Sequence, residues 1–264
     1  MKLAVINFSG NVGKSTVARH LLAARIPGCQ VIAVESINAQ DSPSITIRGR
    51  QFAQLQDALL TVPDLVVDVG ASNVEELLGV MRRYKGSHTD FDAFIVPTVP
   101  DRKQQQDTAA TLAELARIGV PPERLRLVFN RLEEDEPVER VFETLLAFCA
   151  TYGVVKPRLA ACLPYNEVYA RVRGTDCSLI ELAADPSDYK AAIVSADSPA
   201  EQMALVQKLA TQRLAQGVVP ELDACFAALE LVELGQEAPS EQVDLFAPRR
   251  PRSDAASAAA RRRA

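Results

Sequence analysis

The sequence has no tryptophan, two histidines and five cysteines among its 264 residues. The cysteines lie far apart and form no CxxC pair, so free thiols in a reducing compartment explain them better than disulfides or a zinc site. No apolar run approaches the ~18 to 20 residues of a membrane span, and the chain does not open with a cationic segment, an apolar segment and a cleavage site. We therefore expect a cytoplasmic location and no transmembrane segment.

Charge is placed unevenly along the chain. The net charge is −5, yet residues 247–264 carry six arginines against one aspartate, a local charge of +5 that leaves −10 elsewhere. We predict a folded domain over 1–235 and a disordered Arg-rich tail over 236–264. The tail is either a solubilising terminus or a binder of DNA phosphates without sequence preference. An anionic membrane fits less well, because no apolar face accompanies the charge.

Apolar runs typical of strands alternate with helical patterns along the first 165 residues. This alternation predicts an α/β fold, a three-layer architecture in which helices cover both faces of a mostly parallel central sheet, followed by a helical C-terminal region. The expected strands cover 3–8, 30–34, 63–70, 91–98, 125–129 and 158–163. The expected helices run from 14 to about 27 and over 48–60, 101–118, 138–152 and 198–235.

The first sixteen residues, MKLAVINFSGNVGKST, suit a buried strand, a glycine-containing loop and a helix start. Free backbone N–H groups and the helix dipole would there point at one spot, where phosphate binds. Gly13 would let the backbone approach, Lys14 would reach the β- and γ-oxygens, and Ser15 would ligate Mg²⁺. Phe8 replaces the first glycine of the general motif, and an ordinary strand–helix turn is the alternative. The predicted phosphate-binding residues are Gly10, Asn11, Val12, Gly13, Lys14, Ser15 and Thr16.

Acidic residues end two of the predicted strands. Asp68 closes an apolar strand before Gly70, and Glu35 follows the second strand. Since carboxyl ends of parallel strands meet at one edge, both should approach the glycine loop. We predict that Ser15, Asp68 and Glu35 hold Mg²⁺. A turn or helix-cap acid is the alternative for Asp68.

Three further residues follow the fifth and sixth strands at the same predicted edge. Asn130 and Arg131 end the fifth strand, and Pro164 follows the sixth. We predict that they contribute to nucleotide binding, because ligands in such sheets lie outside the carboxyl ends of the strands.

The residues SGNVGKST after one strand, Asp68-Val69-Gly70 after another and Asn130-Arg131 after a third resemble the ParA/MinD superfamily of deviant Walker P-loop ATPases. The opening NFSGNVGK resembles StbB-type plasmid stability proteins. The resemblance implies a P-loop NTPase fold, ATP or ADP with Mg²⁺ as cofactors, Lys14 and Asp68 as catalytic groups, and Asn130 at the adenine. It also implies a nucleotide-dependent homodimer and a plasmid-encoded DNA-binding partner.

Two positions depart from the superfamily pattern. Ser9 stands where the signature lysine crosses to the partner's nucleotide, and Ile37 replaces the second aspartate of the strand-two motif. Phosphoryl transfer depends on such placed charges, so hydrolysis would be slow, or would require a partner or Asp41 from the adjoining loop.

Three functions follow from these observations. The first is a weak Mg²⁺-dependent switch ATPase in plasmid stability, partition or conjugation. The second is an adaptor that holds nucleotide with little or no hydrolysis and docks a DNA-binding partner. The third is a metabolic enzyme of the dethiobiotin synthetase kind, for which the chain offers no readable substrate pocket.

Overall fold

The computed structural model describes residues 1–34, 52–133, 135–175 and 177–231. Glu35 and Asp41, for which we predict roles in metal binding and catalysis, lie outside these ranges. The Arg-rich tail also lies outside them, so the proposed division at residue 235 stays a prediction.

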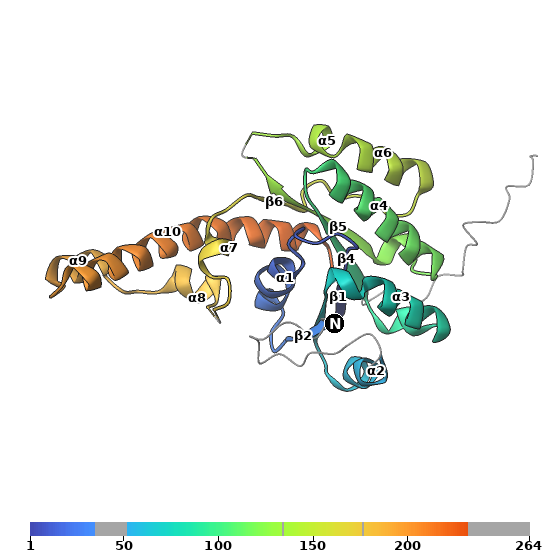
Figure 1. The fold of residues 1–264 in the computed structure, drawn as a ribbon, viewed down its shortest axis with the longest axis horizontal. Coiled ribbons are helices and arrows are strands. Elements are labelled where there is room, and N and C mark those ends of the chain that lie inside the picture. Colours follow the sequence, from blue (N-terminus) through green and yellow to red (C-terminus); the bar gives the residue numbers. More distant parts are fainter. Residues whose placement is uncertain (35–51, 134, 176, 232–264) are drawn as a thin grey trace, which may run out of the picture.

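Six strands form one sheet in the order β2-β3-β1-β4-β5-β6, and every paired neighbour is parallel. The central strands β1, β3 and β4 are buried along almost their whole length, as expected for a sheet covered on both faces. Figure 1 shows the strands crossing the middle of the molecule. The strands are β1 Lys2–Val5, β2 Gln30–Val34, β3 Leu65–Val69, β4 Ala93–Thr98, β5 Leu125–Leu132 and β6 Cys162–Pro164.

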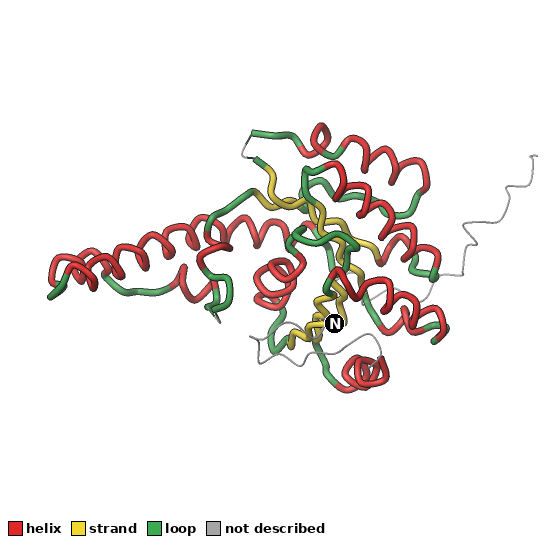
Figure 2. The backbone as a smooth tube through the Cα atoms, viewed as in Figure 1, coloured by secondary structure: helices red, strands yellow, loops and turns green. Residues whose placement is uncertain are grey.

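Helices cover both faces of the sheet, which confirms the three-layer α/β fold (Figure 2). Alternate residues of β1 serve the two layers: Ala4 joins α2, α3, α4 and α6 in one core, and Leu3 joins η1, α7, α8 and α10 in the other. The helices are α1 Lys14–Thr16, continued by η1 Val17–Leu22 and η2 Ala23–Arg25, then α2 Phe52–Thr61, α3 Val74–Arg83, α4 Arg102–Arg117, α5 Val138–Val141, α6 Glu143–Tyr152, α7 Val168–Arg171, α8 Leu179–Ala184, α9 Tyr189–Ser195 and α10 Pro199–Ala228.

The sixth strand begins later than the sequence predicts. Arg158, its expected first residue, forms an ion pair with Glu230 at 2.6 Å, and the Ala161 amide closes a turn onto the Arg158 carbonyl at 2.9 Å. This turn delays strand pairing until Cys162. The strand therefore ends at Pro164, within the carboxyl edge of the sheet.

The thirty-residue helix α10 has one buried half and one projecting half. Val218, Leu222 and Cys225 pack into the core, whereas no residue of α9 and none of 199–211 is buried. Figure 1 shows the projecting half leaving the sheet together with α8 and α9. We call α8, α9 and residues 199–216 the helical arm. Val194 and Met203 on the arm are 86% and 60% exposed.

Among the helices in the described ranges, none combines the length and the apolar character that crossing a bilayer requires.

Candidate functional site

The loop between β1 and α1 adopts a conformation that depends on its glycine. Asn11 and Gly13 both have positive φ, 57° and 90°. A Cβ atom at Gly13 would lie 2.2 Å from Nδ2 of Asn130, so a side chain there would clash as well as strain the backbone. Asn11 tolerates the left-handed region better than most residues. The loop is thus shaped by these two residues and by the approach of β5.

Unpaired amide groups line this loop. The backbone N–H groups of Gly10, Asn11, Val12 and Gly13 have no hydrogen-bond partner within the described part of the chain. The Gly13 carbonyl accepts from the Val17 amide at 2.9 Å, which joins the loop directly to the first helical turn. Converging amides at a helix N-terminus form a site for an anion such as phosphate.

Lys14 places its ammonium inside the loop. Its Nζ donates to the carbonyl oxygens of Ser9 at 2.6 Å and Asn7 at 3.2 Å, and the residue is 8% exposed. Burial lowers the pKa of Lys14 to about 8, an effect that the nearby Asp68 carboxylate partly opposes. A phosphate bound in the loop would place full negative charge next to the Lys14 ammonium, which now contacts only the partial charges of two carbonyl oxygens.

Asp68 lies in β3, aligned with Val5 of β1 and Ala33 of β2, and is buried. Ser15 is exposed in the first turn of α1, which packs beside β3. A carboxylate and a hydroxyl are the oxygen ligands that Mg²⁺ accepts, together with waters and phosphate oxygens. Ser15 and Asp68 therefore fit the predicted cation. Within the described ranges, no three His, Cys, Asp or Glu side chains gather into a metal site.

Asn7 fixes the start of the loop, and our sequence prediction missed it. Its buried amide nitrogen donates to the Pro97 carbonyl and to Thr108 Oγ1, both at 2.8 Å, and its amide oxygen accepts the Ser9 N–H at 2.8 Å. These bonds tie the loop to β4 and α4. A single polar residue ending an apolar strand, AVIN, was the signal in the sequence.

Phe8, at the position of the missing motif glycine, is accommodated outside the loop. Its amide donates to Thr111 Oγ1 of α4 at 3.0 Å, and its ring packs on the core between the sheet, α3 and α4. There it borders an open hollow of about 490 Å³ with residues of α4 and of the segment that enters α3. The Phe8 side chain thus lies on the α3 and α4 side of the sheet.

The end of β5 also reaches the loop. Asn130 Nδ2 donates to the Val12 carbonyl at 2.9 Å, and its Oδ1 accepts the Arg131 amide at 2.9 Å. Arg131 is exposed and has a positive φ of 59°. It lies at the point where the register between β5 and β6 shifts, between Asn130 and Leu132, and Leu132 pairs with Pro164 of β6. Asn130 thus supports the phosphate loop directly, and its contact with adenine stays a prediction.

The segment after Asp68 is tied to the end of β2. The Gly70 amide and the Asn73 side-chain amide donate to the Val34 carbonyl, at 2.9 and 3.2 Å. Glu35 is the next residue in sequence. The structure thus brings β2, β3, β5 and the glycine loop to one edge, while the roles of Glu35 and Asp41 stay predictions.

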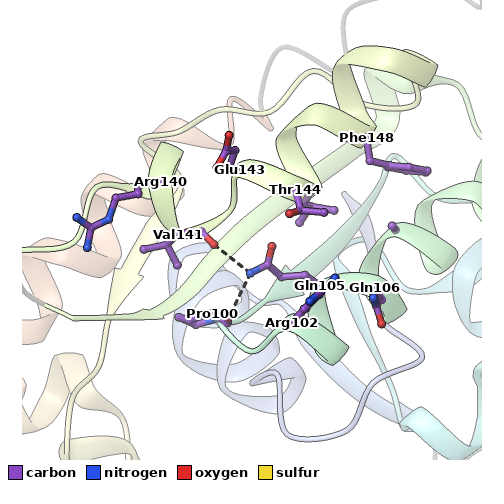
Figure 3. Close-up of a pocket in the computed structure, with 11 residues that line it drawn as sticks. Pro100, Arg102, Gln105, Gln106, Arg140, Val141, Glu143, Thr144 and Phe148 are labelled. Carbon is purple, nitrogen blue, oxygen red and sulfur yellow. Dashed lines mark hydrogen bonds between the residues drawn. The ribbon is translucent and has the colours of Figure 1, made fainter.

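A second hollow, of about 380 Å³, lies between α4 and the α5–α6 segment (Figure 3). Gln105 bridges it by donating to the carbonyls of Pro100 and Val141, at 2.9 and 3.0 Å. None of the predicted site residues lines this hollow. This hollow is a gap between packed helices. The candidate site is therefore the loop at the carboxyl edge of the sheet.

No protein-family model and no curated protein matches the sequence. Solved structures with a similar fold include the MinD cell division protein of Aquifex aeolicus, at 11% identity over 81% of this chain and 96% of that chain, with a TM-score of 0.45. A ParA family ATPase from Chlorobium tepidum matches at 13% identity over 79% and 97%, TM-score 0.43. The Pyrococcus horikoshii MinD complexed with Mg-ADP matches at 15% identity over 82% and 94%, TM-score 0.43. These likenesses are distant.

We expect Thr108→Val to weaken both the fold and phosphate binding. The change leaves Asn7 Nδ2 with one acceptor and should lower the free energy of unfolding by about 1–3 kcal/mol, measured by urea denaturation. Thr151→Val is the matched control, because both hydroxyls donate to the carbonyl four residues earlier, at 2.7 and 2.8 Å. Thr108 is buried and its Oγ1 also lies 3.1 Å from Thr98 Oγ1, whereas Thr151 is exposed, so equal losses in the two variants would show that the contacts of Thr108 with Asn7 and Thr98 contribute nothing.

We expect the affinity for Mg-ATP to fall as pH rises through about 8, the pKa of Lys14 in the free protein. Phosphate favours the protonated amine, so affinity is complete below this pKa and declines above it, by up to about tenfold per pH unit. Equilibrium binding between about pH 7.5 and 9.5 measures the effect. Lys14→Arg stays charged throughout and should show a flat profile; a flat profile in the wild type contradicts the prediction.

Proposed function

We propose that this chain is an ATP-binding, Mg²⁺-dependent switch protein of the ParA/MinD type that acts in plasmid stability, partition or conjugation. The observation that carries the proposal is the buried Lys14 ammonium, turned into a loop of unpaired amides at a helix N-terminus beside Asp68. A cation, amide donors and a carboxylate for the metal-bound water are the parts that bind a nucleotide's phosphates with Mg²⁺.

Slow hydrolysis fits the residues around the loop. Ser9 offers its carbonyl to Lys14 and supplies no second cation, and Ile37 supplies no charge to orient water. Arginine or lysine placed at the transferred phosphoryl group often adds several orders of magnitude to the rate. A partner, a second copy or Asp41 would have to contribute the missing charge.

The second candidate function is a nucleotide-bound adaptor, and the helical arm favours it. Val194, Met203 and Val206 leave apolar surface exposed on helices without a buried residue at this end. Exposed apolar groups on a projecting element suit a protein partner, here a DNA-binding protein. In this function, the bound nucleotide would stabilise the α/β domain from which the helical arm projects.

We expect Lys14→Met to abolish Mg-ATP binding without unfolding the protein. The substitution removes the charge that pairs with phosphate and a desolvated ammonium, so thermal stability should be unchanged or raised. Calorimetry measures binding, and phosphate release with and without DNA measures turnover. ATP binding equal to that of the wild type would exclude the switch and the nucleotide-bound adaptor together, whereas tight binding by the wild type without any turnover would favour the adaptor.

The Arg-rich tail carries a separate part of the proposal, contact with DNA phosphates. We expect deletion of 247–264 to reduce retention on DNA at low salt, because sequence-independent affinity comes from Lys and Arg that displace counterions. Replacing the six arginines by Gln keeps the length and should reduce retention equally. Retention that survives both changes would assign the tail no role in DNA binding.

A further inference from the structure

Two residues that weaken a helix lie inside α10, where the helical arm meets the α/β domain. Gly217 directly follows the arm, and Pro220 comes three residues later. Pro220 has no amide hydrogen, so its helical bond to the carbonyl of residue 216 is missing, and Gly217 adds backbone freedom. A Cβ atom at Gly217 would meet nothing within 4 Å, so packing does not require a glycine there. This junction is the part of α10 that bends most easily.

The arm is tied internally up to this junction. The side-chain amide of Gln212 donates to the Asp185 carbonyl at 2.7 Å, and that of Gln216 donates to the Ala183 carbonyl at 3.3 Å. These bonds fasten residues of α10 to α8 and to the segment that enters α9. The arm therefore forms one unit that is attached to the domain at two places, the buried Leu179 at the start of α8 and the junction in α10.

Arg25 binds the junction from the helix that begins at the phosphate loop. Its Nε donates to Asp223 Oδ1 at 2.8 Å, its Nη2 donates to the Val219 carbonyl at 3.2 Å, and its Nη1 donates to the His20 carbonyl at 2.6 Å. The Arg25 side chain is 7% exposed. Val219 and Asp223 lie on either side of Pro220 in the chain. One guanidinium thus contacts η1 and the weak point of α10, two elements that lie against each other (Figure 1).

The helix between Lys14 and Arg25 changes its hydrogen bonding twice. After the α-helical turn Lys14–Thr16, residues Val17–Leu22 form a π-helix and Ala23–Arg25 a 3₁₀-helix. A π-helix is rare, and a π turn inside a helix often marks a functional site. Conversion of this turn to α-helical bonding would rotate every residue that follows it. The position of Arg25 therefore depends on the hydrogen bonding of the turns next to the loop.

The anchoring of α10 does not require Arg25. Val218, Leu222 and Cys225 already pack into the core beneath the sheet and hold the buried half of the helix. Arg25 adds contacts at the one position where a small shift would change the direction of the arm. Its placement therefore suits communication between the loop and the arm.

We infer that Arg25 couples the phosphate loop to the helical arm, which turns about Gly217 and Pro220 when nucleotide binds. The inference rests on the proposed nucleotide-binding function and adds how the bound state reaches the arm. Phosphate would draw Lys14 toward itself, the turns after the loop would shift, and Arg25 would carry the shift to α10. Arg25 is a positioning residue, and the π turn and the junction supply the element with two arrangements that coupling requires.

The test is hydrogen exchange of the backbone amides in residues 212–224, measured without nucleotide and with Mg-AMPPNP. We expect nucleotide to change these exchange rates by at least about threefold in the wild type and to leave them unchanged in Arg25→Gln and Asp223→Ala. Arg158→Gln is the matched control, because Arg158 pairs at 2.6 Å with Glu230, beyond the other end of α10. This control should respond as the wild type does.

Two glycine substitutions separate coupling from simple anchoring. Gly217→Ala and Gly79→Ala both favour their helices and should raise the unfolding temperature, since a Cβ atom at Gly79 in α3 meets only Arg82 Nη2 at 3.7 Å. Gly217→Ala stiffens the junction and should reduce the nucleotide-induced change in exchange at least about twofold. Gly79→Ala should leave that change as it is. An anchoring role would not produce this result, because both variants gain stability.

Calorimetry of Mg-AMPPNP binding separates this inference from the proposed function. A wild type that binds nucleotide without any change in exchange over 212–224 overturns the coupling and leaves the phosphate site standing. A response in Asp223→Ala and Gly217→Ala equal to that of the wild type also overturns it, and these two variants keep Arg25 in place should Arg25→Gln fail to fold. A wild type that does not bind nucleotide overturns both the coupling and the proposed function.

Discussion

The geometry of the candidate site centres on a buried ammonium group held inside a backbone loop. An uncompensated charge in an apolar interior is costly, and Lys14 is retained because the carbonyls of Asn7 and Ser9 and the charge of Asp68 face it. Asn7 and Ser9 belong to the loop that follows β1, whereas Asp68 belongs to the neighbouring strand β3. The parallel pairing of β1 with β3 brings the carboxylate to this loop. The loop is therefore a product of the whole sheet as well as of its local sequence.

The helix that follows the loop is fixed at both ends. At its start, Asn7 and Thr108 hold the loop to α4, and at its end Arg25 donates to Asp223 at 2.8 Å and to the Val219 carbonyl at 3.2 Å in α10. The arm-bearing helix thus touches the helix that begins at the phosphate site. The helix that begins at the loop is therefore the single element between the proposed nucleotide site and α10, which carries the arm.

The layers, the mostly parallel sheet and the glycine-containing loop between a strand and a helix could be predicted from the sequence, because apolar periodicity and glycine spacing are local signals. The hydrogen bonds of Asn7 and Asn130 could not, since both join segments about 90 to 120 residues apart. The sixth strand was predicted to begin too early, because the apolar pattern does not reveal the turn in which the Ala161 amide donates to the Arg158 carbonyl.

Structure determination of the chain with AMPPNP and Mg²⁺ tests the central claim most directly. We predict that Lys14 Nζ leaves the Ser9 carbonyl for β- and γ-phosphate oxygens, with the amides of Gly10 to Gly13 facing the phosphates and Ser15 on the metal side. A nucleotide bound elsewhere, with Lys14 still hydrogen-bonded to Ser9, would contradict it.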